Sequence, residues 1–122
     1  MEFFKCRMCG NIIAYVKDSG APIKCCDQDI EKIVPGTVVA AQEKHIPVVK
    51  RSGEKVFVKV GDVAHPMKYD HYIEWIALET TSGNQRKLLK PGEEPQVCFH
   101  IFDADKVVKA YSYCNLHSLW SS

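Results

Sequence analysis

A set of metal-type donors, spread over most of the chain, restricts how this sequence can fold. Cys114 and His117 lie three positions apart in the segment Tyr113-Cys114-Asn115-Leu116-His117 near the C-terminus. A strand that ends at Tyr113 and turns at Asn115 would return His117 to the Cys114 sulfur. Thiolate and imidazole are ligands that suit zinc, copper and iron. Because one cysteine and one histidine do not complete a site, the fold must bring further donors to this turn.

Three more histidines lie in local contexts that suit ligands: His45, His65 and His71. Pro66 follows His65 and favours an extended backbone before it, so a loop can aim that ring. His71 comes six residues later, where the loop enters a predicted strand. We expect these three rings to converge on Cys114 and His117.

Two charged residues precede His45. A lone histidine before a strand is more often structural than a ligand, but Glu43 and Lys44 place a carboxylate and an ammonium beside this one. Taken by themselves, those two charges are most simply explained as a solvated pair.

A second donor group occupies the cysteine-dense first segment. Cys6 and Cys9 form a Cys-x-x-Cys pair followed by glycine, and Cys25 and Cys26 are adjacent. Four thiolates suit zinc or a mononuclear iron, whereas two disulfides are the alternative in an oxidising compartment. Adjacent cysteines are unusual for a zinc ribbon and favour a distorted iron centre. About 35 residues bury too little apolar surface to be stable alone, so such a segment needs a metal or an oligomeric partner.

The composition limits the other classes of function. The chain has 122 residues, 46% of them hydrophobic, and a formal net charge of +1. This balance predicts neither a nucleic-acid partner nor a membrane-surface partner. No apolar stretch resembles a membrane span, and the N-terminus lacks the apolar run of a secretory signal. We therefore expect a cytoplasmic protein, in which cysteines are metal ligands before they are disulfides.

The pattern of apolar residues predicts an all-β protein with two domains. Cysteine becomes rare and β-branched residues dominate after Val34-Pro35-Gly36, which places the boundary at residue 36. A short strand is expected within residues 11–16. Further short strands separated by turn signals indicate a β-sandwich. They are expected at residues 45–50, 55–60, 72–78, 85–89, 96–102 and 106–113.

Four other residues are given structural roles. Cys98 and His100 fall within a predicted strand, where Cys98 is expected to be a small buried hydrophobic residue and His100 a paired or exposed one. Trp75 and Trp120 are expected to pack in the core or at the rim of the histidine site.

Taken together, the motifs resemble superoxide reductase, and the N-terminal cysteines make the chain similar to its two-iron form, desulfoferrodoxin. The resemblance covers nearly the whole sequence. It rests on four ordered motifs and the four N-terminal cysteines: Glu43-Lys44-His45-x-Pro47-Val48, His65-Pro66-Met67, His71-x-Ile73-Glu74-Trp75, and Cys114-Asn115-Leu116-His117.

The resemblance implies a desulforedoxin-like domain at residues 1–36 and an immunoglobulin-like catalytic β-sandwich at residues 37–122. It implies two iron ions per chain and a homodimer. The implied ligands of the catalytic iron are His45, His65, His71 and His117 in a plane, with Cys114 axial and a sixth position open. The implied ligands of the other iron are Cys6, Cys9, Cys25 and Cys26.

The implied reaction is one-electron reduction of superoxide to hydrogen peroxide, with electrons from a rubredoxin-like donor. In this reading Lys44 attracts the anion, and Glu43 becomes a ligand once the iron is ferric. The four-cysteine iron either relays electrons or only holds its domain together. An iron electron-transfer protein without turnover is the alternative function. A zinc-binding structural or nucleic-acid module is disfavoured by the near-neutral charge.

Overall fold

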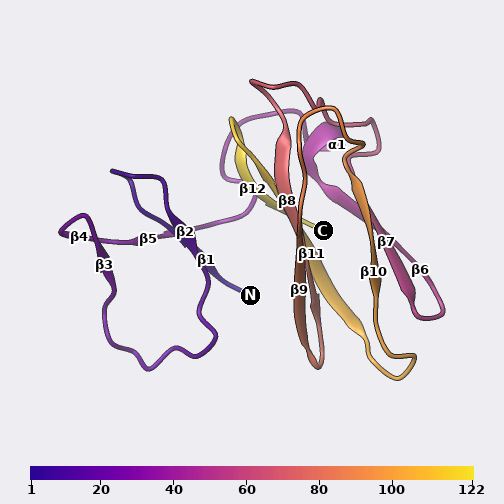
Figure 1. The fold of residues 1–122 in the computed structure, drawn as a ribbon, viewed down its shortest axis with the longest axis horizontal. Helices are drawn as coiled ribbons and strands as arrows, with labels where there is room; N and C mark the ends of the chain where they lie inside the picture. The colour runs from indigo at the N-terminus through magenta and orange to yellow at the C-terminus, as the bar shows by residue number, and fades with distance from the viewer. The chain divides into compact units, whose positions relative to one another are not determined.

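The computed structural model describes all 122 residues and is almost entirely β-structure (Figure 1). The all-β prediction is therefore confirmed. The chain forms two compact units, residues 1–34 and residues 35–122. The helix α1 (Gln42–His45) is one turn long. No helix has the length and apolar character needed to cross a bilayer.

The first unit contains very short strands. A three-stranded antiparallel sheet has the order β2 (Ile12–Ile13), β1 (Phe3–Lys5) and β5 (Glu31–Ile33). A separate hairpin joins β3 (Lys24–Cys25) to β4 (Gln28–Asp29). Of the strand predicted at residues 11–16, only the two residues of β2 form ladder pairs with β1. Such small sheets place few side chains in a core, so other interactions must stabilise this unit.

The β3–β4 turn explains how two adjacent cysteines are accommodated. Cys25 ends β3, while Cys26 and Asp27 form the two-residue turn with φ values of 54° and 60°. Positive φ at both central positions is the signature of a type I′ hairpin turn. The strand residue and the turn residue can then present their sulfurs to one point.

The second unit is a two-layer antiparallel β-sandwich. One sheet has the order β10 (Gln96–His100), β7 (Lys55–Val60) and β6 (Pro47–Ser52). The other has the order β12 (Ser118–Ser121), β11 (Val107–Cys114), β8 (Ile73–Thr80) and β9 (Gly83–Leu88). The sequence prediction missed β12. It also began a strand at His45, whereas His45 ends α1 and β6 begins at Pro47.

Strict alternation in β7 shows how the sandwich core forms. Val56, Val58 and Val60 are buried against residues of the other sheet, while the intervening side chains face outward. In the neighbouring strand β10, Phe99 is buried and His100 is exposed, as expected. Cys98 is half-buried on the outward side, so its assignment to the core was wrong.

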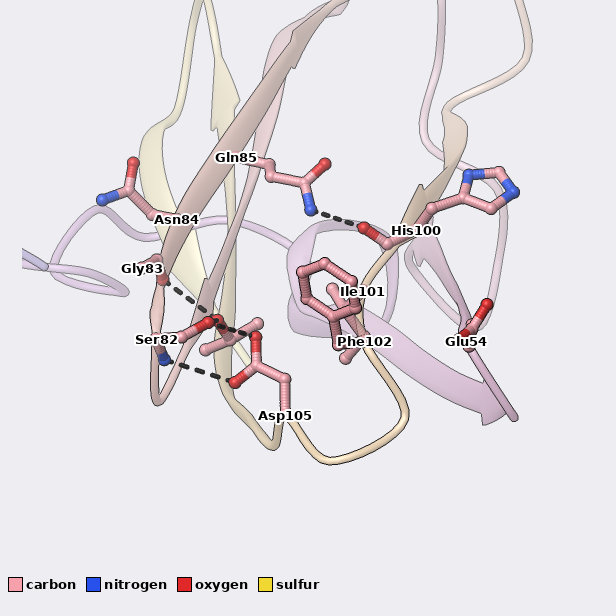
Figure 2. A pocket seen from close by; sticks show the side chains of 10 residues that line it. Glu54, Ser82, Gly83, Asn84, Gln85, His100, Ile101, Phe102 and Asp105 are labelled. Carbon is pink, nitrogen blue, oxygen red and sulfur yellow. Dashed lines mark hydrogen bonds between the residues drawn. The ribbon is translucent and has the colours of Figure 1, made fainter.

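Hydrogen bonds fix the end of the sandwich that carries the β8–β9 turn (Figure 2). The Asp105 carboxylate accepts bonds from the Ser82 hydroxyl at 2.6 Å, the Thr81 hydroxyl at 2.8 Å and the Ser82 backbone N–H at 3.2 Å. Gln85 donates to the His100 carbonyl at 2.8 Å. These bonds attach the β8–β9 hairpin to the end of β10 and to the loop between β10 and β11.

Candidate metal centres

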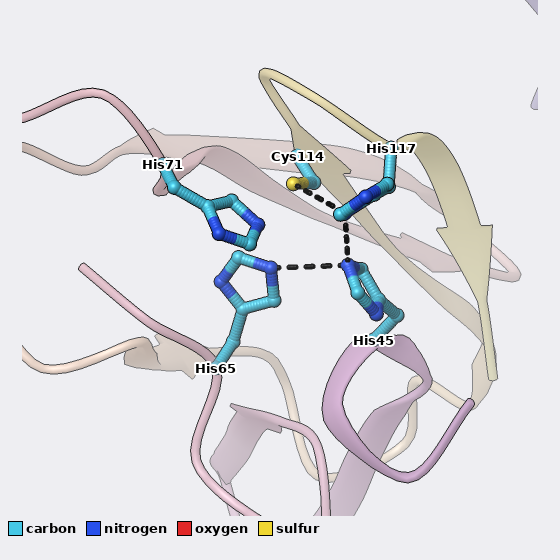
Figure 3. Close-up of side chains that lie close together, drawn as sticks. All are labelled: His45, His65, His71, Cys114 and His117. Carbon is cyan, nitrogen blue, oxygen red and sulfur yellow. Dashed lines mark hydrogen bonds between the residues drawn. The ribbon is translucent and has the colours of Figure 1, made fainter. Parts of the chain in front are cut away.

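The opposite end of the sandwich brings five donor side chains together (Figure 3). His45 comes from α1, His65 from the loop after β7, and His71 from the residues just before β8. Cys114 ends β11, and His117 lies in the turn before β12. Their candidate ligand atoms all lie within 4.8 Å of one another. The four histidines and the cysteine named from the sequence are therefore neighbours in the fold.

The four imidazoles stand at the corners of a near-square. The ring centroids are 4.6 Å apart for His45 and His65, 4.8 Å for His65 and His71, 5.1 Å for His71 and His117, and 4.9 Å for His117 and His45. The diagonal between His45 and His71 is 6.5 Å. Neighbouring rings are steeply inclined, at 75° to 86°. This arrangement directs one nitrogen of each ring toward a common centre.

Two backbone carbonyls determine which nitrogens face that centre. His45 Nδ1 lies 2.7 Å from the Ala41 carbonyl, and His65 Nδ1 lies 2.7 Å from the Pro66 carbonyl. A carbonyl only accepts, so each Nδ1 carries the proton and each Nε2 presents a lone pair. These two Nε2 atoms face each other at 3.1 Å. Two lone pairs at this distance repel each other unless a cation lies between them, so the geometry fits a metal ion.

His71 gives a second indication of a cation. Its Nε2 is buried and has no hydrogen-bond partner. Buried polar atoms are rarely left unsatisfied, and metal coordination would satisfy this one. Burial lowers the pKa of His71 and His45, and it lowers the pKa of His65 to about 4. The rings are therefore neutral near pH 7, which is the form that binds metals.

Cys114 is placed by an irregularity in the sheet. The β11–β8 register shifts between Tyr113 and Cys114, where a β-bulge lets Cys114 pair with Ile73. Bulges re-aim side chains next to active sites. The sulfur lies 3.7 Å from His117 Nδ1. Burial raises the pKa of the Cys114 thiol, although the backbone N–H groups of Leu116 and His117 partly oppose this.

Asn115 was predicted only to form a turn, yet it holds His71 in place. Its side-chain oxygen accepts from the Tyr72 backbone N–H at 2.9 Å, and its side-chain N–H₂ donates to the Asp70 carbonyl at 2.9 Å. The bonds fall on both sides of His71. The Cys114–His117 turn thus sets the position of a candidate ligand from a distant segment.

Three further residues, not singled out in these roles by the sequence, support the site. The fully buried Ser112 hydroxyl donates to the His45 carbonyl at 3.0 Å. Trp120, expected only to pack, also donates from its indole N–H to the His117 carbonyl at 2.9 Å. Its ring lies 4.9 Å from that of His45. Gly61 packs so tightly that an added Cβ would lie 2.7 Å from the Glu43 carbonyl oxygen.

Glu43 and Lys44 are exposed residues of α1, directly before His45. Burial is the main cause of the lowered His45 pKa, and the Lys44 charge adds to it. Lys44 also contributes to the lowered pKa of His71, again after burial. The positive field of Lys44 therefore reaches the histidine cluster.

The four N-terminal thiols form the second group. Cys6, Cys9, Cys25 and Cys26 also lie with their sulfurs within 4.8 Å of one another. The backbone N–H of Cys9 is the main cause that lowers the Cys6 pKa to about 6. The nearby Cys9 and Cys6 side chains raise the Cys26 pKa to about 12. Four thiols this close cannot all ionise without a cation, and a tetrahedral thiolate site for zinc or iron supplies one.

The donor sets also limit which metal suits each group. Structural zinc is almost always four-coordinate, so four imidazoles with a thiolate exceed its usual ligand number. Imidazole and thiolate both suit iron, and four thiolates hold mononuclear iron as well as zinc. Residues present in the two groups therefore fit two iron ions.

Comparison with known proteins identifies the family. Residues 37–122 match the desulfoferrodoxin family model, and residues 1–33 match the model of the desulfoferrodoxin N-terminal domain. The chain belongs to the desulfoferrodoxin family. This family member is 45% identical over 122 residues to a desulfoferrodoxin homolog from Archaeoglobus fulgidus, covering 100% of the chain and 96% of that relative. It is 43% identical over 121 residues to a desulfoferrodoxin from Nitratidesulfovibrio vulgaris, covering 99% of the chain and 94% of the relative.

Solved structures agree with this family. The superoxide reductase from Treponema pallidum superposes with a TM-score of 0.83 at 41% identity, covering 99% of this chain and 97% of that one. A one-iron superoxide reductase from Giardia intestinalis matches with a TM-score of 0.56 at 37% identity, covering 66% of this chain and 95% of that one.

Proposed function

We propose that this protein is a superoxide reductase: it adds one electron and two protons to superoxide and releases hydrogen peroxide. The observation that carries the proposal is the convergence of four histidine nitrogens and the Cys114 sulfur within 4.8 Å, in a chain of the desulfoferrodoxin family. Similar proteins named superoxide reductase support it.

His45, His65, His71, His117 and Cys114 would hold the catalytic iron. When bound, ferrous iron supplies the electron that superoxide receives. Burial favours the neutral form of His45, His65 and His71. Ferrous iron with neutral imidazole ligands and one thiolate would give the site a net charge of +1. A positive, partly desolvated site attracts an anion and strengthens its binding.

Lys44 and Glu43 are the residues to which we assign substrate handling. The Lys44 ammonium is exposed, and its field already reaches His45 and His71. We assign it the attraction of superoxide toward the site. The Glu43 carboxylate is a hard anionic ligand on the same turn, suited to the more positive ferric state, and we assign it a role after oxidation.

The four-thiol unit would hold the second iron through Cys6, Cys9, Cys25 and Cys26. Two roles are consistent with its structure. It stabilises a unit of 34 residues that has only short sheets, or it passes electrons toward the second unit. We also propose a homodimer, because a unit this small gains stability from a partner.

The remaining assignments follow from the chemistry. Each turnover consumes one electron, so an external one-electron donor is required, and we propose a rubredoxin-like protein. We propose a cytoplasmic location, since none of the six cysteines forms a disulfide and reduced thiols persist in that compartment.

Rapid mixing of the reduced, iron-loaded protein with superoxide tests the function. One peroxide should form per superoxide consumed, with no oxygen released and two irons found per chain. Release of oxygen would indicate a dismutase instead. A reaction no faster than spontaneous superoxide decay would indicate an electron carrier and would contradict the proposal.

A further inference from the structure

The outward side of the β10–β7–β6 sheet combines an apolar centre with positive charge. The register places Lys50, Phe57 and Cys98 in one row across the three strands. Phe57, on the central strand, leaves 46% of its surface exposed. Val48 and Cys98 are half-buried around it. We call this side of the sheet the outer face.

The outer face is hollow rather than flat. A depression of about 450 Å³ is lined by Val48, Lys50, Phe57, Lys59 and Cys98, among other residues. Exposed apolar side chains within a concave surface are typical of an interaction site.

Three lysines surround the apolar centre. Lys50, Lys55 and Lys59 all project outward, and none of the nine outward positions of the three strands carries a carboxylate. Asp62, at the rim, is the one acidic residue that lines the depression. The outer face is therefore positively charged, although the whole chain has a net charge of only +1.

This charge pattern disfavours a two-fold contact between copies of this chain. Such a contact places the same patch on both sides, so the three lysines would meet their own counterparts. A partner that presents carboxylates around an apolar centre would complement both the charge and the hollow.

The depression lies on the half of the sheet nearest the histidine cluster. β6 begins two residues after His45, and β7 ends five residues before His65. Val48 is three residues from His45, a span of at most about 10 Å along the chain. A protein docked in the depression would therefore be close to the proposed catalytic metal.

We propose that the outer face is the docking surface for an acidic electron-donor protein. The inference rests on the proposed function, because that reaction needs one external electron per turnover. Phe57 provides the apolar contact, and Lys50 and Lys59 provide the charge that orients the donor.

The test uses an acidic rubredoxin, reduced and mixed anaerobically with the oxidised, iron-loaded protein. The variant carries Lys50→Glu and Lys59→Glu, and the matched control carries Lys106→Glu, an exposed position in the loop before β11. We expect the double variant to be reduced about tenfold more slowly at low salt and to lose most of its salt dependence. The control should stay within about twofold of the unchanged protein. Phe57→Ser should also slow the transfer, with a weaker effect on salt dependence.

Three results would overturn the proposal. Equal rates for the double variant and the unchanged protein would place the donor elsewhere. An equal slowing by Lys106→Glu would mean that only net charge matters. A double variant that sediments differently from the unchanged protein, with no donor present, would show that the outer face is a contact between copies of this chain. The reaction of chemically reduced protein with superoxide is measured separately, and its failure would overturn the proposed function while the docking result stands.

Discussion

Lys44 and Glu43 carry opposite charges at adjacent positions beside the histidine cluster, so they can be tested against each other. Lys44→Ala should lower the second-order rate constant with superoxide about tenfold at low salt, because it removes the positive charge to which we assign the attraction of the anion. The remaining rate should depend less on salt. Rapid mixing at several ionic strengths measures both effects.

Glu43→Ala is the matched control for Lys44→Ala, because it removes a negative charge from the same turn. It should leave the encounter rate unchanged or raise it. If both variants slowed the reaction equally, the cause would be a disturbed α1 rather than charge.

Substitution of Asn115 should affect stability and metal binding, because its side chain holds the backbone on both sides of His71. Asn115→Asp keeps the acceptor for the Tyr72 N–H but places an oxygen against the Asp70 carbonyl, where a donor now lies at 2.9 Å. We expect a loss of about 1–3 kcal/mol in unfolding free energy. We also expect iron affinity to fall about 10- to 100-fold. Denaturant unfolding and competition with a chelator measure these quantities. Asn84→Asp, at an exposed position of β9, should change neither, and an equal effect there would point to charge alone.

At the level of elements, α1 is held against the loop after β7 by a contact that only glycine permits. Gly61 has a φ of +85°, and a Cβ there would lie 2.3 Å from the Val63 carbonyl oxygen and 2.7 Å from that of Glu43. Gly61→Ala should therefore move α1, which carries Lys44 and His45. We expect a destabilisation above the cost of about 1–3 kcal/mol for backbone strain alone, together with slower superoxide reduction.

Gly92→Ala separates these two contributions. Gly92 has a similar φ of +90°, but an added Cβ would meet nothing within 4 Å. Gly92→Ala should be destabilised only by the backbone strain, and it should keep its activity. Denaturant unfolding and rapid mixing measure both variants. If Gly61→Ala and Gly92→Ala lost the same stability and the same activity, the Gly61 contact would not position α1.

Asp105, in the loop between β10 and β11, should make the stability of the opposite end of the sandwich depend on pH. Hydrogen bonds from Ser82, followed by other donors, hold the pKa of Asp105 well below its usual range. Its ionised form therefore stabilises the fold above the unfolded pKa of about 3.9, and this stability is lost as the pH falls below that value. Asp105→Ala should be less stable than the unchanged protein at pH 6, and the difference should shrink below about pH 4. A difference that stayed constant across this range, in urea unfolding, would contradict the assignment.

The elements also show what could be read from the sequence. Cysteine and histidine have distinctive chemistry, so the nine donors could be named and grouped before their positions were known. The β7 strand was predicted at residues 55–60 because its valines alternate with outward-facing residues. The supporting roles of Ser112, Asn115 and Gly61 could not be predicted, because each consists of a contact with a segment distant in the chain. The strand β12 was missed because it has only four residues, which is too short for a clear alternating pattern.

At the scale of the whole molecule, the two units differ in what stabilises them. The second unit has a continuous apolar core between two sheets, formed by residues such as Val58, Leu78 and Phe99. The first has 34 residues, strands of two or three residues, and four clustered thiols. Metal binding should therefore be coupled to folding mainly in the first unit.

Cys9→Ser tests this difference and also the role of the second iron. Removing one thiolate should release one of two irons and abolish the unfolding transition of the first unit, while the second unit keeps its own transition. Cys98→Ser is the control, since Cys98 is a thiol outside both donor groups, and it should retain both irons. Metal analysis and calorimetry measure these outcomes.

The same variant tests the role of the second iron. If chemically reduced Cys9→Ser protein consumes superoxide at the full rate and is also re-reduced by the donor at the full rate, the four-thiol iron is structural. A normal superoxide reaction with slowed re-reduction would instead assign it to the electron path.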